Sequence, residues 1–134
     1  MGQNGRMNSA LNIALSGLQA NATRVAVSAN NIANMRTTGR ADAPETAYQP
    51  QEVSAVAQEG GGVEVNVRGT DPATTTAYAP TDANADAEGQ VAMPNVSLEK
   101  EMVDNMMAVT GYKANATVIR SLAAMDKSLL DITA

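Results

Sequence analysis

The sequence predicts a mainly α fold with a small β insertion, in which long N- and C-terminal helices form a coiled-coil-like pair and a β-hairpin and loops lie between them. Apolar residues recur at helical spacing near both ends of the chain. All five prolines and a run of three glycines lie between these regions, where valines alternate with polar residues. The chain is therefore divided into a flexible extension or tag remnant (1–6), an N-terminal helix (8–39), an insertion (40–95) and a C-terminal helix (96–134).

The N-terminal helix is predicted over residues 8–35 from an apolar stripe whose members are separated by four and three residues in turn: Leu11, Leu15, Leu18, Ala22, Val25, Ala29 and Ile32. This spacing is typical of a coiled-coil seam. The other positions are mainly polar or alanine, so a single face is apolar. The helix is expected to end after Asn34, where Thr37, Thr38 and Gly39 form a stop signal.

The insertion is predicted to contain a β-hairpin at about residues 46–69. Every second residue from Val63 to Val67 is valine, which is the pattern of a strand with one buried face. Val53 and Val56 lie in a preceding segment that can pair with this strand across the run Gly60–Gly62, which we interpret as the hairpin tip rather than a phosphate-binding loop. A second extended piece is expected at 90–93, and residues 70–89 as polar loop.

The C-terminal helix is predicted to begin after Ser97, a candidate N-cap with Glu99 and Glu101 in the first turns. Its apolar stripe changes phase by about one residue along its length and comprises Met102, Met106, Val109, Tyr112, Ala116 and Ile119, then Val118, Leu122, Met125, Leu129 and Ile132. Such a helix would be about 55 Å long, against about 42 Å for its N-terminal partner. Part of its apolar face is therefore expected to meet other subunits.

Composition excludes most catalytic chemistry. The chain contains no cysteine and no histidine, so the usual thiol nucleophile, general base and transition-metal ligands are missing. Glu99 and Asp104 are five residues apart and would diverge on a helix, which argues against a carboxylate pair. We expect no enzyme activity, no cofactor, no metal and no small-molecule substrate.

Large aliphatic side chains are scarce, which bears on folding. Leu, Ile, Val and Phe together make up about 17% of the chain, below the roughly 20% at which a chain resembles disordered proteins. The monomer is therefore expected to complete its core by assembly. No stretch approaches the 18 apolar residues of a membrane span, and the N-terminus lacks the pattern of a cleavable signal peptide.

The charge is unevenly distributed. Residues 1–40 contain four arginines and no acid, whereas residues 41–95 contain nine acids and only Arg68. The arginines are far apart and lack interleaved aromatic residues, so a solvated or subunit-facing helix side is favoured over nucleic acid binding. Residues 82–89 begin like a calcium loop, but Ala87 and Met93 occupy the positions that require Gly and Glu. An Asx-rich turn is the favoured interpretation.

Short motifs lie at both ends of the chain. The N-terminal set consists of Ser16–Ala20, Ala29–Asn34 and Thr38–Gly39, similar to an SGLxA…ANNIAN…TG signature. The C-terminal set consists of Met93–Val96, Glu101–Val103 and Tyr112–Asn115, similar to MPNV…EMV…YxAN. Both sets resemble the signatures of flagellar basal-body rod proteins, most closely of their short proximal-rod type. The resemblance implies a structural subunit that is exported without cleavage by the flagellar type III apparatus and polymerises in the periplasm as part of the torque-transmitting rod.

The expected partners follow from this resemblance. They are copies of the chain itself and other rod proteins, with the MS-ring or the base of the export gate as a further neighbour, and no nucleic acid. The predicted subunit-interface residues are Leu11, Leu15, Leu18, Val25, Asn30, Asn31, Ile32, Asn34, Met102, Met106, Val109, Tyr112, Asn115, Ile119, Leu122, Met125 and Leu129.

Two alternatives remain open at this stage. The asparagines near the end of the first helix either fix the register across a helical interface or lie where the helix frays. Tyr112 either anchors a neighbouring subunit or caps the β insertion.

A different function, that of a secreted adaptor or effector which uses rod-type ends for export and docking, predicts a partner complex but no filament.

Overall fold

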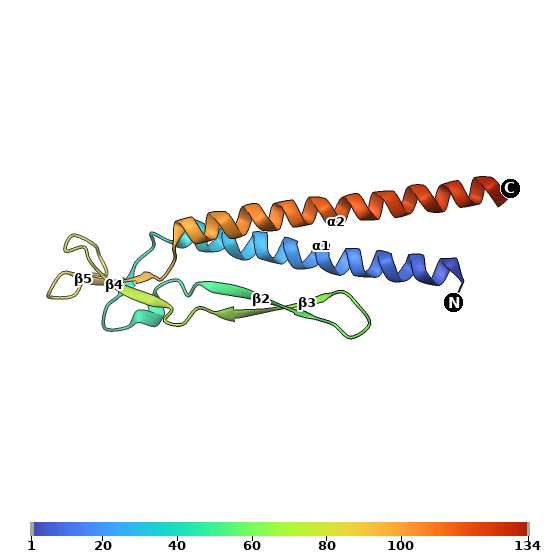
Figure 1. Cartoon of the computed structure of the whole chain (residues 1–134). Coiled ribbons are helices and arrows are strands. Elements are labelled where there is room, and N and C mark those ends of the chain that lie inside the picture. The colour runs from blue at the N-terminus through green and yellow to red at the C-terminus, as the bar shows by residue number, and fades with distance from the viewer. Residues whose placement is uncertain (1, 134) are drawn as a thin grey trace.

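The computed structural model describes residues 2–133 and consists of two long antiparallel helices with the β elements between them in sequence. Helix α1 (Gln3–Asn34) and helix α2 (Leu98–Thr133) lie side by side, with both chain termini at the same end of the molecule (Figure 1). This arrangement confirms the predicted mainly α fold with a β insertion. The predicted stop after Asn34 is also confirmed, and Ser97 caps α2 by accepting a hydrogen bond from the Lys100 backbone N–H at 3.4 Å.

Helix α1 begins earlier than predicted. Residues 3–6, which the sequence placed in a flexible extension, belong to the first turns of α1. Gly39 also differs from its predicted role as a helix stop, because it lies in strand β1 (Gly39–Arg40) with its backbone against that of Ala47. A Cβ atom at this position would overlap the Ala47 backbone nitrogen, so the close approach explains the glycine.

The β elements form two separate sheets. Strands β2 (Gln51–Ala57) and β3 (Val63–Gly69) form an antiparallel hairpin that confirms the prediction for residues 46–69. Strand β5 (Gln90–Pro94) confirms the extended piece expected at 90–93 and lies between β1 and β4 (Thr74–Tyr78). A short 3-10 helix, η1 (Pro44–Thr46), follows β1.

The prediction of polar loop throughout residues 70–89 was wrong for the part that forms β4. Residues 74–76 are three consecutive threonines, which favour extended backbone but give no alternation of polar and apolar side chains. Pairing with β5, which follows after a long turn, makes this segment a strand.

The hairpin lies along the side of α1 that faces away from α2, so the molecule has three layers over part of its length (Figure 1). At the hairpin tip Gly60, Gly61 and Gly62 have φ angles of 96°, 100° and 91°, which L side chains rarely adopt. Gly61 packs against the side chain of Ile13, and the Val63 backbone N–H donates to Ser16 Oγ at 3.1 Å. The tip is therefore fixed to the middle of α1.

The buried core is small. Among the described residues, the buried hydrophobic core is mostly alanine: it consists of Ala14, Ala20, Ala47, Ala92 and Ala108, together with Val91. The accessible surface is 8862 Å², whereas a compact monomer of 13.8 kDa would expose about 6,600 Å².

Within the described residues, neither helix combines the length and apolar character that a membrane span requires.

Candidate assembly surface

The two helices meet through small residues rather than through leucines. Gly17 of α1 faces the side chain of Asn115, and Gly111 of α2 faces the side chain of Asn21. Each asparagine donates through Nδ2 to the carbonyl oxygen of the glycine four residues before it in its own helix, at 2.8 Å in α1 and 2.9 Å in α2. The two pairs are reciprocal, so the same Gly-x-x-x-Asn spacing on each helix brings the antiparallel backbones close together.

The apolar stripe predicted on α1 lies beside this contact and is only partly covered within the chain. Leu11 and Leu15 are 39% and 43% exposed, and Ala22 and Ala29 are exposed as well. Leu18, Val25 and Ile32 are half-buried, and Leu11 lines a groove between the helices. The spacing of the stripe predicted a helix correctly, but the close approach to α2 is made by the neighbouring small and polar residues.

Asn31 links three elements of the molecule. Its side chain is fully buried, and its Nδ2 donates to the Gln51 carbonyl oxygen at 2.7 Å and to Glu101 Oε1 at 2.9 Å. Its Oδ1 accepts hydrogen bonds from the Gln51 backbone N–H at 3.1 Å and from the Tyr48 hydroxyl at 2.9 Å. The Asn31 amide thus donates two hydrogen bonds and accepts two, which satisfies both its NH₂ group and its oxygen. These four bonds hold α1, β2 and α2 in one register.

The other two asparagines behave differently. Asn34 Nδ2 donates to the backbone carbonyl oxygen and the side chain of Asn30, each at 3.0 Å, so both residues bond locally on the exposed side of α1. Of the two interpretations drawn from the sequence, register fixing therefore holds for Asn31 within the chain. A role of Asn30 and Asn34 at a subunit interface stays a prediction.

The environment of Tyr48 and Glu101 supports this junction. Burial, and then the negative charge of Glu101, raise the pKa of the Tyr48 phenol above its ordinary value of about 10. Ser28, which is buried, donates to the Glu101 backbone carbonyl oxygen at 2.8 Å. Neither Tyr48 nor Ser28 was singled out from the sequence, because nothing local distinguishes a residue whose partner is 17 or 73 positions away.

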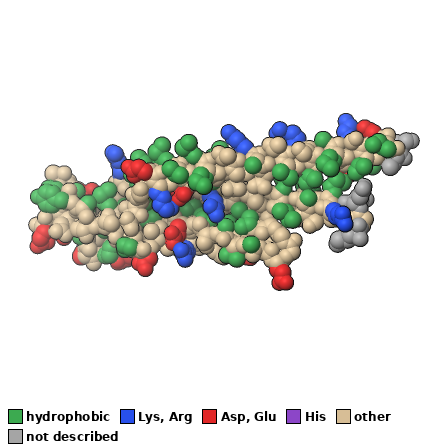
Figure 2. Space-filling view, in the orientation of Figure 1, with side chains coloured by type: hydrophobic (Ala, Val, Ile, Leu, Met, Phe, Trp, Pro, Cys, Tyr) green, Lys and Arg blue, Asp and Glu red, His purple; other side chains and the backbone are tan. Residues whose placement is uncertain are grey.

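Most of the predicted residues of α2 lie on its surface. Met102, Met106 and Met125 are 51%, 67% and 56% exposed, and Tyr112 is 40% exposed. Leu129 is also exposed, while Val109, Asn115, Ile119 and Leu122 are half-buried. Hydrophobic side chains gather on the outer face of the first half of α2 and between the free ends of the helices (Figure 2).

Charged groups form local pairs rather than a catalytic constellation. A cleft of about 240 Å³ between α1, β2 and α2 is lined by Arg24, Glu52, Lys100 and Glu101. Lys100 Nζ lies 2.6 Å from Asp104, and this hydrogen bond is the main cause that raises the pKa of Lys100. Among the described residues, no group of three acids is placed to hold a metal ion.

The acidic segment at residues 82–89 is an Asx-rich turn, as favoured from the sequence. Asp82 Oδ1 accepts from the Asn84 backbone N–H at 2.8 Å, and both carboxylate oxygens accept from the Thr38 hydroxyl. Asp86 Oδ1 accepts from the backbone N–H groups of Glu88 and Gln90. These carboxylates therefore organise the turn beside the end of α1.

Comparison with known proteins identifies similarity at both ends of the chain. Residues 11–39 match a family described as flagella basal body rod protein, and residues 87–132 match one described as flagellar basal body rod FlgEFG protein C-terminal. The flagellar basal-body rod protein FlgC of Bacillus subtilis is 32% identical over 91% of this chain and 95% of its own length. FlgC proteins of Yersinia enterocolitica and Salmonella typhimurium are each 38% identical over 84% of this chain and 87% of theirs.

Proposed function

Since the chain belongs to the FlgC family of flagellar basal-body rod proteins and is a structural subunit of the proximal rod, we propose that it polymerises through the apolar faces that α1 and α2 leave exposed. The contacting residues are those predicted from the sequence, from Leu11 and Leu15 on α1 to Met106 and Met125 on α2. Neighbouring subunits cover these faces, and the covered helices transmit torque along the rod.

One observation carries this proposal. The helices pair through Gly17, Asn21, Gly111 and Asn115, and this pairing leaves Leu11 and Leu15 about two-fifths exposed, while the other large residues of the stripe are half-buried. Exposed apolar stripes of this kind mark interaction surfaces in soluble proteins. The surplus of roughly 2,200 Å² of accessible surface over a compact monomer of this mass is in the range that stable interfaces bury.

We also propose the partners and the location of the chain. The chain contacts copies of itself and other rod proteins, with the MS-ring or the base of the export gate as a further neighbour. The flagellar type III apparatus exports it uncleaved to the periplasm. Tyr112, which is 40% exposed, contributes an inter-subunit anchor. The chain performs no catalysis, because stiff packing rather than a reactive site is what a torque-bearing subunit needs.

The proposal is tested by the substitution Leu15→Asp. Because Leu15 is already 43% exposed, the isolated chain is expected to keep its helical circular dichroism spectrum. Burying the new carboxylate against a neighbour is unfavourable, so incorporation into isolated basal bodies, measured by immunoblot, should be lost together with motility. Gln19→Asp, at an exposed polar position one turn further along α1, is the matched control and should assemble normally.

Normal incorporation of Leu15→Asp would show that this stripe is not an interface. Complete rods in cells that lack the chain would contradict the rod role itself and would support the adaptor alternative.

A further inference from the structure

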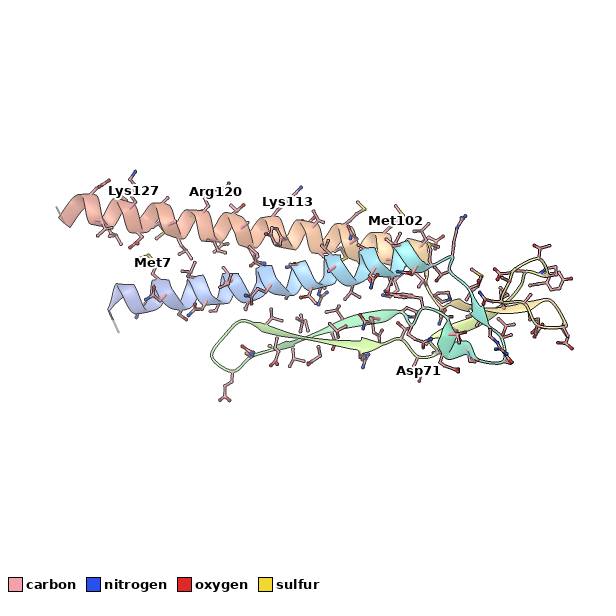
Figure 3. All side chains as sticks on the ribbon, turned by 180° about the vertical axis from the view of Figure 1, so that it is seen from behind. Met7, Asp71, Met102, Lys113, Arg120 and Lys127 are labelled. Atoms are coloured by element: carbon pink, nitrogen blue, oxygen red, sulfur yellow. The ribbon has the colours of Figure 1, made fainter. Side chains whose placement is uncertain are left out.

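The ends of the two helices nearest the chain termini border an apolar groove that none of the described residues fills. This end groove has a volume of about 510 Å³ and is lined by Met7, Ala10, Leu122 and Met125, with Arg6 beside them. Met7 lies between the free ends of the two helices (Figure 3). The lining is mainly apolar, so the groove suits an apolar occupant of side-chain size.

The other half of the molecule carries an apolar cluster of matching character. Met102, Val103, Met106 and Met107, here called the Met patch, are 51%, 54%, 67% and 68% exposed on the first turns of α2. Met102 points away from α1 (Figure 3). Methionine side chains are unbranched and adapt to irregular grooves, so this patch suits insertion between two helices.

The two features cannot meet within one chain. Met106 and Met125 are 19 residues apart on one continuous helix, a separation of about 28 Å. They lie toward opposite ends of the same elongated molecule. A contact between the Met patch of one copy and the end groove of another must therefore join two copies, and in parallel copies it is heterologous and can repeat without closing.

Charge favours contact between opposite ends of two copies. Residues 36–50 and 70–105, which form the end with the three-stranded sheet and the start of α2, contain nine acids and three bases. Residues 2–12 and 111–133, toward the free helix ends, contain four bases and two acids. Contact between like ends would bring like charges together, whereas opposite ends attract. The Met patch follows Glu99 and Glu101 in the first turn of α2, and Arg6 lines the end groove.

We propose that the Met patch of one copy inserts into the end groove of a second copy and so sets a head-to-tail orientation of subunits. This inference rests on the proposed polymerisation and adds to it which two surfaces meet. The occupant of the groove is a second copy of this chain, and the Arg6 side of the groove faces the acidic first turn of the inserted helix.

Disulfide trapping tests the contact directly, because the chain contains no cysteine and any disulfide must join introduced thiols. The double variant Met106→Cys/Met125→Cys replaces the native chain in cells, basal bodies are isolated and oxidised, and covalent dimers are measured by non-reducing electrophoresis. An intrachain bond is excluded because disulfides require Cα atoms within about 7 Å. The matched control is Met106→Cys/Ala124→Cys, in which the second thiol lies beside Met125 but is not among the groove-lining residues.

The expected result is a reducible ladder of dimers and higher multimers from the first pair that is absent from the control, whereas a dimer without higher multimers would indicate a reciprocal pair and would overturn the head-to-tail orientation. Basal bodies that contain the variant chain but give no dimer would overturn the inference and leave the rod role standing. Equal dimer from both pairs would also overturn it. Absence of the wild-type chain from isolated basal bodies would instead contradict the proposed function.

A second variant tests the contact between the Met patch and the end groove if the introduced cysteines themselves prevent assembly. Met106→Asp/Met107→Asp places two carboxylates in the proposed contact and should abolish incorporation, while Thr117→Asp, also exposed on α2, should not. Normal incorporation of the double aspartate variant would overturn the inference.

Discussion

At the residue scale, a buried amide side chain determines the register of the helices and the hairpin, which the small apolar core does not determine by itself. Asn31 makes four hydrogen bonds to β2, α2 and Tyr48, and its side chain is fully buried. In a molecule whose core is mainly alanine, apolar packing alone would tolerate several registers of the helices. A fully satisfied amide restricts them, because any shift leaves a buried polar group without a partner.

Asn31→Ala is expected to destabilise the isolated chain by about 2–4 kcal/mol, because the Gln51 backbone and the Tyr48 hydroxyl lose their buried partner. The measurement is urea unfolding followed by circular dichroism. Asn30→Ala is the control, since Asn30 is exposed and its side chain bonds locally to Asn34, and it should change the free energy of unfolding by less than about 0.5 kcal/mol. Equal effects of the two substitutions would refute the role assigned to Asn31.

The raised pKa of Tyr48 predicts a specific pH dependence. The folded chain holds the phenol proton more tightly than the unfolded chain. Its contribution to stability is therefore complete below the unfolded pKa of about 10 and is lost as pH rises through the higher folded pKa. Tyr48→Phe should cost about 1 kcal/mol near neutral pH, and its difference from the wild type should shrink above pH 10.

The check is urea unfolding at both pH values. Tyr78→Phe serves as the control because Tyr78 is 76% exposed, so it should show no such convergence. A penalty for Tyr48→Phe that stays constant across the pH range would mean that ionisation of this phenol is not linked to folding.

At the scale of elements, the hairpin and the helices depend on one another. An isolated two-stranded hairpin is marginally stable in water. Here its tip is held by Ser16, whose hydroxyl donates to the Ile13 carbonyl oxygen at 2.7 Å and accepts from the Val63 backbone N–H. The other end of the hairpin is held by Asn31 through Gln51. Both attachments are on α1, so this helix carries the hairpin along its length.

Ser16→Ala is expected to loosen the hairpin tip while the helices persist. Loss of one hydrogen bond of about 1 kcal/mol should raise amide hydrogen exchange at Val63 and its neighbours several-fold. Exchange in α2 should not change. Ser121→Ala on the exposed side of α2 is the control, and unchanged exchange at Val63 in the Ser16 variant would show that the tip is held by its packing on Ile13 alone.

At the scale of the whole molecule, the chain exposes more surface than its mass requires. The residues after Leu122 on α2 are exposed as far as Ile132. At this end the molecule consists of the two helices alone, without the third layer that the hairpin forms on α1 (Figure 1). Helices gain most of their stability from packing rather than from propensity. The second half of α2 is therefore the part of the chain that depends most on its neighbours.

This dependence predicts a difference between free and assembled chain. In the isolated protein, amides after Leu122 should exchange with solvent fastest among the helical residues, and in isolated basal bodies they should become protected. The measurement is hydrogen exchange with mass spectrometry on both samples. Equal exchange in the two states would show that α2 gains no cover in the rod.

Periodicity and composition were sufficient to predict the main elements. Apolar residues separated by four and three positions near both ends of the chain predicted the two helices, because this spacing places the residues on one face only in a helix. The alternating valines and the glycine run fixed the hairpin in the same way, and the motif residues indicated the family before any coordinates. Strand β4 was missed because its pairing partner, not its own pattern, makes it a strand.

The sequence by itself determined the two helices, the hairpin, strand β5, their order and the family, since each is recorded in local spacing or in contiguous motifs. Only the tertiary structure decided which helix faces meet. The leucine stripe was expected at the seam, yet the close contact uses Gly17, Asn21, Gly111 and Asn115, and Leu11 and Leu15 stay about two-fifths exposed. The physical reason is that hydrophobicity identifies a face that must be covered but not what covers it. Close backbone approach and satisfied amides select the partner within the chain, and the remaining apolar face is left for assembly.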